Sequence, residues 1–274
     1  MEERIIVSLT TWFKRIQNIP AVLDTIFGQT MPPDLVVLNL AFDEVVPDNI
    51  QQYIEEHHIE VNRVPDTKVY KKILPTMKKY PEDCIISIDD DWLYPKGMIE
   101  DFVHIHKKYP NNPISGNRVV SELMQCQCRH GFASLVKAEY YENLLGLIDD
   151  ELIKNCPADD IVWTYLANKA GHPYLRTKGE YYFNMQPYNQ VESYSISDVG
   201  NDGNRDATLY LINRFGAIDK NFIKPFVKDD YMSWLIYGIS TDLYSKLNER
   251  YQVMLNSKSY AMAKSILSLW NKIR

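Results

Sequence analysis

The sequence is poor in cysteine and has no long apolar run. Its cysteines, Cys84, Cys126, Cys128 and Cys156, have the spacing of neither a zinc site nor a thioredoxin-type motif, so we expect reduced, mostly structural thiols. No stretch approaches the roughly 18 apolar residues that a membrane span needs. The apolar run Ile5–Val7 near the amino terminus is too short for a signal peptide. These absences predict a soluble, cytoplasmic protein.

Positive charge is also scarce. The chain has 30 lysine and arginine residues against 36 aspartate and glutamate residues, which gives a net charge of −6 at pH 7. A protein that binds the phosphates of DNA or RNA needs a basic surface. The charge balance therefore argues against a nucleic-acid partner.

Glycine-rich phosphate loops are missing as well. The first predicted strand, residues 4–9, is followed by Thr10, Thr11 and Trp12, with no glycine that would let a pyrophosphate approach the main chain. The chain also has no Walker lysine loop. Any phosphate that it binds must be held by a metal ion and by scattered basic side chains.

What the sequence does contain is an alternation of strand and helix patterns. The 274 residues, 45% of them hydrophobic, suffice for one large α/β domain or for a domain with an appendage. We expect strands at 4–9, 35–40, 59–64 and 84–88, and helices at 20–27, 48–57, 71–79 (interrupted at Pro75) and 98–108. This order predicts an α/β fold, with a mostly parallel sheet and helices on both of its faces.

The strongest chemical signal is the acidic triplet Asp89–Asp91. It follows the apolar run Cys84–Ile88, a buried strand by its length and composition. Charges at the carboxyl end of such a strand lie at the edge of the sheet where ligands bind. Three adjacent carboxylates repel each other unless a cation neutralises them, and all-oxygen ligands favour Mg²⁺ or Mn²⁺ over Zn²⁺. The alternative is a solvated acidic turn, against which the apolar run and the following Trp92 argue.

A second acidic pair, Asp159 and Asp160, precedes the predicted helix at 161–170, which ends at Gly171. An aspartate at a helix start is most often a cap, which stabilises the helix by about 1 kcal/mol. Two adjacent acids can divide the work, so that one caps the helix and the other points into a cleft.

Four segments in this order resemble the bacterial family-2-like glycosyltransferases of the GT-A type that build surface polysaccharides. They are Ser8–Thr11, Lys72–Pro75, Ile88–Pro95 with its Asp-x-Asp pattern, and Ala158–Trp163. The resemblance covers roughly residues 4–215 and implies the GT-A (nucleotide-diphospho-sugar transferase, Rossmann-like) fold. It also implies a hexosyltransferase that moves a sugar from a UDP-sugar to a glycan acceptor, lipid-linked, in capsule or lipopolysaccharide synthesis. The implied cofactor is Mn²⁺ or Mg²⁺, and the implied stereochemistry is inversion.

The resemblance further implies which residues bind the nucleotide. The loop after the first strand would hold it through Thr10, Thr11 and Arg15. Asp66 would contact the base, although a turn residue after Pro65 explains it equally well. Lys72 would lie near the phosphates or the base, and the alternative for it is a solvated lysine on a helix.

The resemblance also divides the acids by role. Asp89 would face the ribose and contribute to the metal site, Asp91 would bind the metal, and Asp90 would take part in cofactor binding in a way that stays open. Asp160 would be the base that removes the proton from the acceptor hydroxyl, with Asp159 as its helper or as a helix cap. Relatives more often have Glu-Asp here, so the assignment within the pair stays open.

Residues 216–274 are predicted to form a helical extension of a catalytic domain at 1–215. The last segment, 257–274, carries four basic and no acidic side chains together with Trp270. Such an amphipathic helix lies on an anionic membrane surface, packs on its own domain, or makes a homodimer contact. The first choice would place the protein on the inner face of the cytoplasmic membrane.

Two other functions stay open. A metal-dependent phosphohydrolase would use the triplet as its ion site, but it does not account for Asp159 and Asp160. A non-enzymatic, divalent-ion-dependent sugar-binding module would bind glycan without a nucleotide, and it would not need Thr10, Asp66 or Lys72.

Overall fold

The structure of the protein is a computed structural model, and it describes residues 3–116, 118–119, 127–128, 133–177, 185–191 and 203–218. All of these residues lie in the first of the two units into which the chain divides, Met1–Ile223. The predicted extension at 216–274 lies outside the described residues except for its first three positions, and the segment 257–274 lies wholly outside them. None of the helices in the described ranges is both long enough and apolar enough to cross a membrane.

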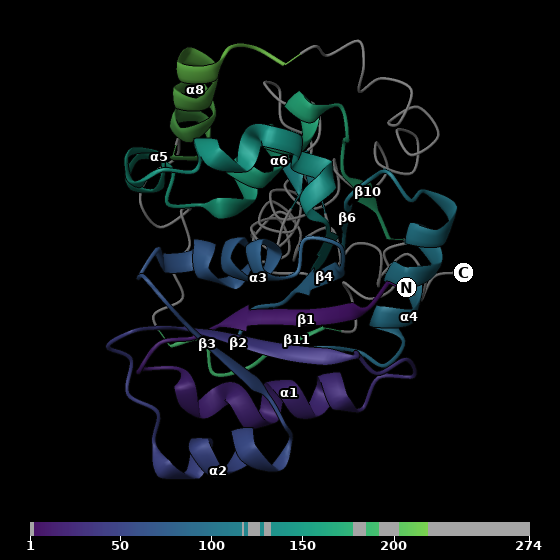
Figure 1. Cartoon of the computed structure of the whole chain (residues 1–274), viewed down its shortest axis with the longest axis vertical. Coiled ribbons are helices and arrows are strands. Elements are labelled where there is room, and N and C mark those ends of the chain that lie inside the picture. Colours follow the sequence, from purple (N-terminus) through teal and green to yellow (C-terminus); the bar gives the residue numbers. More distant parts are fainter. Residues whose placement is uncertain are drawn as a thin grey trace, which may run out of the picture. The chain divides into compact units, whose positions relative to one another are not determined.

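A seven-stranded sheet with the order β10-β6-β9-β4-β1-β2-β3 forms the centre of the fold (Figure 1). Its strands are β1 (Ile5–Thr10), β2 (Leu35–Ala41), β3 (Glu60–Val64), β4 (Cys84–Ser87), β6 (Ile114–Ser115), β9 (Ser134–Val136) and β10 (Leu175–Arg176). Strand β9 is antiparallel to both of its neighbours, and all other pairs in this sheet are parallel. Two small antiparallel sheets pair β5 (Trp92–Leu93) with β11 (Gln186–Pro187) and β7 (Arg118–Val119) with β8 (Gln127–Cys128).

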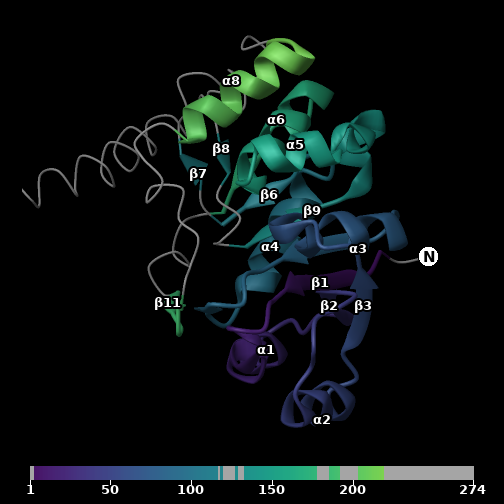
Figure 2. The ribbon, with the colours of Figure 1, turned by 90° about the vertical axis from the view of Figure 1, so that its left-hand side faces the viewer.

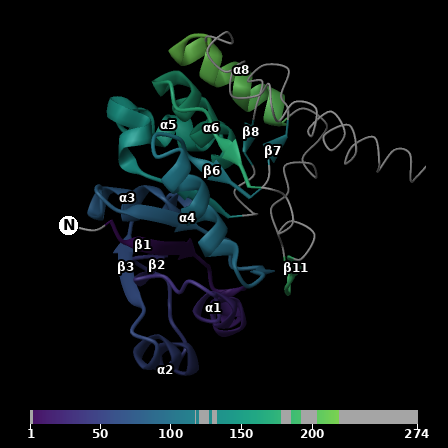
Figure 3. The ribbon, with the colours of Figure 1, turned by 90° about the vertical axis from the view of Figure 1, so that its right-hand side faces the viewer.

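Helices cover both faces of this sheet. The α-helices are α1 (Ile19–Phe27), α2 (Asp48–Glu56), α3 (Leu74–Lys79), α4 (Met98–Lys108), α5 (Asp150–Asn155), α6 (Asp159–Ala170) and α8 (Gly203–Phe215). The described part of the chain also contains the 3₁₀ segments η1 (Ile16–Asn18), η2 (Lys68–Lys72) and η4 (Ala138–Leu147). Helices α1 and α2 lie on one side of strands β1–β3, and α3 and α6 lie on the other (Figure 1, Figure 2 and Figure 3). The predicted α/β fold with a mostly parallel sheet is confirmed.

The central strands are buried because both faces of the sheet are covered. In β1 the side chains of Ile6, Val7 and Leu9 are fully buried, and so are Ile85 and Ile86 in β4. Continuous apolar runs of this kind are typical of parallel strands between two helical layers. The core of the domain therefore lies along β1 and β4, the two strands whose carboxyl ends lead to the polar loops described below.

The segment predicted as one helix at 71–79 is two elements. Pro75 lies in the first turn of α3, and the preceding residues form the separate 3₁₀ segment η2. A proline fits the first turn of a helix because its missing N–H has no partner to lose there. The break matters for the site, since it turns the end of η2, with Lys71 and Lys72, toward the carboxyl edge of the sheet.

Candidate functional site

The candidate site residues gather at the carboxyl edge of the sheet. Strands β1, β2, β3 and β4 run parallel to one another, so their carboxyl ends meet at the same edge. Thr10 ends β1, Asp66 follows β3, and the acidic triplet follows β4. This is the edge at which ligands bind in open α/β sheets.

The loop between β1 and α1 holds two of the three triplet carboxylates. Thr11 Oγ1 donates to Asp90 Oδ2 at 2.6 Å. The guanidinium of Arg15 pairs with both acids, with Nη2 at 3.1 Å from Asp90 Oδ1 and Nη1 at 2.7 Å from Asp91 Oδ2. The side-chain amide of Asn18 donates to the main-chain oxygen of Asp90 at 3.1 Å. Asp90, which is 1% exposed, therefore connects the triplet to this loop. Its role was left open by the sequence, and in the structure its contacts fix the position of the loop relative to the triplet.

Lys72 connects the triplet to the second acidic pair. Its Nζ donates to Asp89 Oδ1 at 2.9 Å and lies 3.5 Å from Asp159 Oδ2. Only 6% of the Lys72 side chain is exposed, so the interpretation of this residue as a solvated lysine is wrong. Two acidic motifs far apart in the sequence therefore meet at one buried ammonium group.

Burial makes two of the triplet carboxyls, those of Asp90 and Asp91, weaker acids than usual. Burial raises the pKa of Asp90 to about 6, although the charge of Arg15 and the hydrogen bond from Thr11 oppose it. Burial also raises the pKa of Asp91 to about 7, and the negative charge of Asp89 adds to this effect while Arg15 opposes it. The single positive charge of Arg15 therefore does not balance the negative charges of the neighbouring aspartates.

Negative charge also exceeds positive charge around Lys72, which pairs with Asp89 and Asp159. Burial raises the pKa of Asp159, and the charge of Lys72 opposes the rise. Burial lowers the pKa of the Lys72 ammonium, but the charges of Asp159 and Asp89 outweigh burial, and its net pKa is raised.

Charge and ligand type in this group fit a divalent cation. Four carboxylates, those of Asp89–Asp91 and Asp159, face two cationic side chains, Arg15 and Lys72, so full ionisation leaves a net charge of −2. Aspartate oxygens suit Mg²⁺ or Mn²⁺. Asp91 and Asp89 stay the predicted ligands.

A buried polar network fixes the segment that carries Lys72. Ser8 Oγ donates to the main-chain oxygen of Lys72 at 2.6 Å and lies 2.6 Å from Thr76 Oγ1. The side-chain amide of Asn39 donates to both hydroxyls, at 3.0 Å to Ser8 and 2.8 Å to Thr76. Ser8, Asn39 and Thr76 are fully buried. The network ties η2 and α3 to β1 and β2, so the position of Lys72 is set by the sheet itself.

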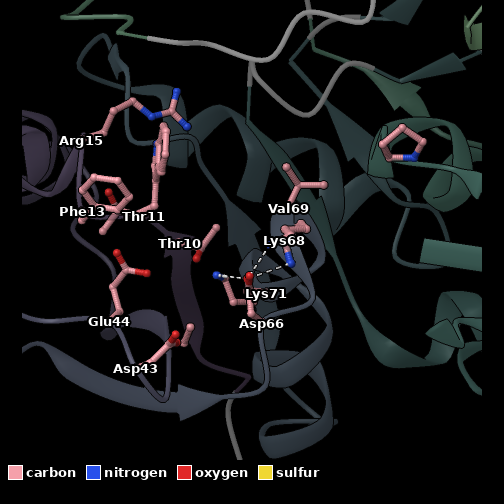
Figure 4. A pocket seen from close by; sticks show the side chains of 13 residues that line it. Thr10, Thr11, Phe13, Arg15, Asp43, Glu44, Asp66, Lys68, Val69 and Lys71 are labelled. Carbon is pink, nitrogen blue, oxygen red and sulfur yellow. Dashed lines mark hydrogen bonds and ion pairs between the residues drawn. The ribbon is translucent and has the colours of Figure 1, made fainter. Parts of the chain in front are cut away.

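A pocket of about 950 Å³ opens at the same edge of the sheet (Figure 4), and the residues that line it do not include the triplet, Lys72 or the second acidic pair. Side chains from the ends of β1, β2 and β3 and from η2 line it, among them Thr10, Thr11, Phe13, Arg15, Asp66 and Lys71. Pro157, two residues before Asp159, also lines the pocket. Its volume lies at the upper end of the range for small-molecule and cofactor sites.

Asp66 is a charged acceptor inside this pocket. Burial alone would raise its pKa, but hydrogen bonds from Lys68 and Lys71 lower the pKa of the carboxyl to about 2. Lys71 Nζ donates to Asp66 Oδ1 at 2.6 Å, and Figure 4 draws the contacts of Asp66 with both lysines. The same oxygen accepts the main-chain N–H of Lys68 at 3.2 Å, so Asp66 shapes the turn as well as the pocket.

The second acidic pair opens α6, which ends at Gly171 with a φ of +92°, as glycine permits. The N-cap is Ala158, which makes no side-chain cap bond, and Asp159 is the first helical residue. Its carboxylate points to Lys72, so Asp159 is not a cap. Asp160 is half-buried, and its main-chain oxygen accepts the hydroxyl of Thr164 at 2.7 Å. The structure thus brings Asp159 to the triplet, whereas the role of Asp160 as base stays a prediction.

Sequence reasoning missed Asn18, Asn39 and Thr76. The signal was present for Asn39 and Ser8, since each is a polar residue inside an apolar strand pattern. A buried polar side chain of this kind needs hydrogen-bond partners. Which partners it finds depends on the neighbouring strand and helix, and sequence spacing does not give them.

No protein-family model matches the chain, and no curated protein sequence matches it either. Many solved structures are similar to it, among them the following three. Glucosyl-3-phosphoglycerate synthase from Mycobacterium tuberculosis, in complex with Mn²⁺, UDP and phosphoglyceric acid, has 13% identity over 80% of this chain and 80% of that chain, with a TM-score of 0.48. S. aureus TarS 1–349 in complex with UDP has 13% identity over 68% of this chain and 56% of that chain, with a TM-score of 0.43. A 4-diphosphocytidyl-2C-methyl-D-erythritol synthase has 13% identity over 65% of this chain and 89% of that chain, with a TM-score of 0.42. At these identities the similarity concerns the course of the chain alone, and the chemistry of the site has to be argued from its own residues.

Proposed function

We propose that this protein is a metal-dependent glycosyltransferase of the GT-A type that transfers a sugar, with inversion, from a UDP-sugar to a glycan acceptor. The observation that carries the proposal is the position of Lys72 between Asp89 of the triplet and Asp159 of the acidic pair. A pocket large enough for a nucleotide supports the proposal, because its lining includes Arg15, the partner of Asp90 and Asp91, and Pro157, two residues before Asp159.

Each part of the proposed reaction has residues that can serve it. The ionised Asp66 can accept hydrogen bonds from a base, and Thr10 and Arg15 line the same pocket. A divalent cation held by Asp91 and Asp89 would stabilise the charge on the departing diphosphate. Asp160, next to the ion-paired Asp159, would take the proton of the acceptor hydroxyl, because direct displacement needs a base opposite the leaving group.

The alternatives account for fewer of these contacts. A phosphohydrolase needs the metal site but gives no reason for Lys72 to tie Asp159 to the triplet. A sugar-binding module needs neither the nucleotide-sized pocket nor a charged Asp66 within it.

The metal site is tested by the substitution Asp91→Asn. We expect the affinity for UDP measured with Mn²⁺ to fall to the level measured without Mn²⁺, because the amide removes a charged ligand from the ion while keeping its shape. Isothermal titration calorimetry measures both affinities. Asp43→Asn is the matched control, since Asp43 lines the same pocket but lies outside the triplet. Unchanged Mn²⁺-dependent UDP binding in Asp91→Asn would remove Asp91 from the metal site.

We further propose that the acceptor is lipid-linked, that the product is a bacterial surface polysaccharide such as capsule or lipopolysaccharide, and that the enzyme works at the inner face of the cytoplasmic membrane. The four basic and no acidic side chains of residues 257–274 support this proposal. Deletion of 257–274 should abolish co-sedimentation with anionic liposomes, since each basic residue near such a surface contributes about 1 kcal/mol. Turnover of a short water-soluble acceptor should survive the deletion. An intact protein that does not co-sediment, with a truncation that lowers the melting temperature or changes the oligomeric state, would instead assign the segment to the core or to a homodimer contact.

A further inference from the structure

Arg15 stands at the junction of the acidic triplet and the pocket. Its guanidinium bridges Asp90 and Asp91, and its side chain lines the cavity in which the nucleotide is proposed to bind. One fifth of the side chain, 20%, is exposed, and within the described residues its buried Nε has no hydrogen-bond partner. Arg15 therefore pairs with two of the acids while its side chain lines the pocket (Figure 4).

The contact of Arg15 with Asp91 conflicts with metal binding. A divalent cation ligated by Asp91 would share one carboxylate with a guanidinium whose Nη1 lies 2.7 Å from Asp91 Oδ2. Two cations on the same carboxylate repel each other strongly in a buried site, where the effective dielectric constant is low. Either the guanidinium of Arg15 or the divalent cation therefore binds the Asp91 carboxylate, and the two compete for it.

The loop can release Arg15 without losing its hold on the triplet. Asp90 keeps the hydroxyl of Thr11 at 2.6 Å and the amide of Asn18 on its main-chain oxygen. Departure of Arg15 breaks its contacts with Asp90 and Asp91, and a metal that also uses Asp89 competes with the contact from Lys72. A free guanidinium in the pocket suits a diphosphate, because its planar fork forms paired, charge-assisted hydrogen bonds with phosphate oxygens.

We propose that Arg15 exchanges partners when donor and metal bind. In the free protein it neutralises Asp91; when the divalent cation takes over Asp91, Arg15 passes to the diphosphate of the nucleotide. Nucleotide and metal then bind cooperatively, because each of them favours the conformation in which Arg15 has left Asp91. The inference rests on the proposed function, since it needs a diphosphate in the pocket.

Mn²⁺ and UDP titrations of the wild type and of Arg15→Gln test the exchange. Without UDP, the variant should bind Mn²⁺ roughly tenfold more tightly than the wild type, because no guanidinium competes for Asp91. With saturating Mn²⁺, it should bind UDP roughly tenfold more weakly, because the diphosphate loses a partner. The factor by which UDP raises Mn²⁺ affinity, about 5- to 150-fold for typical coupled sites, should therefore shrink in the variant.

Lys14→Gln is the matched control. It removes the same charge from the same loop, but the Lys14 ammonium lies over the rings of Trp12 and Phe13, 5.1 and 5.8 Å from their centres. Its Mn²⁺ and UDP affinities should stay within about twofold of the wild-type values, since charges in water are largely screened. Electron paramagnetic resonance of free Mn²⁺ and calorimetry with UDP measure the two affinities without any turnover.

The outcomes separate the inference from the function on which it rests. If the wild type binds Mn²⁺ and UDP but Arg15→Gln binds Mn²⁺ no more tightly, the exchange is wrong and the proposed function stands. If the wild type binds neither, both fail. Should Arg15→Gln not fold, Arg15→Met replaces it, because methionine removes the same charge and keeps a flexible, unbranched side chain. Mn²⁺ affinity equal to the wild-type value in Arg15→Met would then overturn the exchange.

Discussion

The substitution Asp160→Asn is expected to lower turnover by roughly two to four orders of magnitude while leaving UDP affinity close to the wild-type value. The amide cannot accept the proton of the acceptor hydroxyl, but it has nearly the shape of the carboxylate. The contacts that Asp160 makes through its main-chain oxygen, with the hydroxyl of Thr164, are unaffected by the change. Steady-state turnover with saturating donor and acceptor measures the first effect, and calorimetry with UDP and Mn²⁺ measures the second.

Asp159→Asn is the comparison that decides between the two acids. Asp159 is buried, and its carboxylate lies 3.5 Å from the Lys72 ammonium, so its replacement should weaken folding as well as any role in catalysis. Burial raises the pKa of Asp159, a direction that also suits a base working near neutral pH. If Asp159→Asn removes turnover and Asp160→Asn retains it, the base is Asp159. If neither variant loses turnover, the inverting-base hypothesis is wrong.

The first half of the fold could be predicted because each element carries its own local signal. Helix α4 spans Met98–Lys108, the predicted residues, since its buried side chains Met98, Ile99, Phe102 and Val103 recur at helical spacing. The strands β1, β2 and β3 lie within one residue of their predicted bounds for a similar reason.

The second half could not be predicted in the same way. Strand β9 has three residues and enters the sheet between β4 and β6, antiparallel to both. Three residues are too few to show a period, and the pairing joins Ile86 to Leu135 and Ile114 to the same Leu135 across long stretches of sequence. Only the packing of the finished sheet selects that position.

The candidate site, too, has a part that local sequence predicts and a part that depends on tertiary packing. That three adjacent aspartates at the end of a buried strand need a cation follows from electrostatics alone. How they share their partners does not: Asp90 turns to Thr11, Asp91 pairs with Arg15 and Asp89 with Lys72. Those choices depend on how the loop after β1 and the end of η2 approach the sheet. The buried Asn39 helps to set this approach, but the sequence shows it only as a polar residue in an apolar strand and does not give its partners Ser8 and Thr76.

The substitution Lys72→Met is expected to lower the free energy of unfolding by about 3 to 5 kcal/mol at pH 8, the usual cost of removing one partner from a buried ion pair. The methionine fills nearly the same volume, so the loss comes from charge: Asp159 would keep a buried carboxylate without its ammonium partner. Urea unfolding followed by circular dichroism measures the effect. Lys71→Met is the matched control, because Lys71 is equally buried but pairs with the more exposed Asp66. Its loss should be clearly smaller.

The pH dependence of this loss shows whether the charge of Asp159 causes it. A carboxyl whose pKa is higher in the folded chain than in the unfolded chain binds more protons when folded, so its contribution to stability falls as pH rises. Burial already raises the pKa of Asp159, and removing Lys72 removes the charge that opposes the rise. The difference between Lys72→Met and wild type should therefore grow from pH 5 to pH 8, and the second substitution Asp159→Asn should recover part of the stability at pH 8. A loss that is the same at both pH values, and unchanged in the double variant, would mean that Lys72 contributes by packing and that the charge connection between the two acidic motifs does not stabilise the fold.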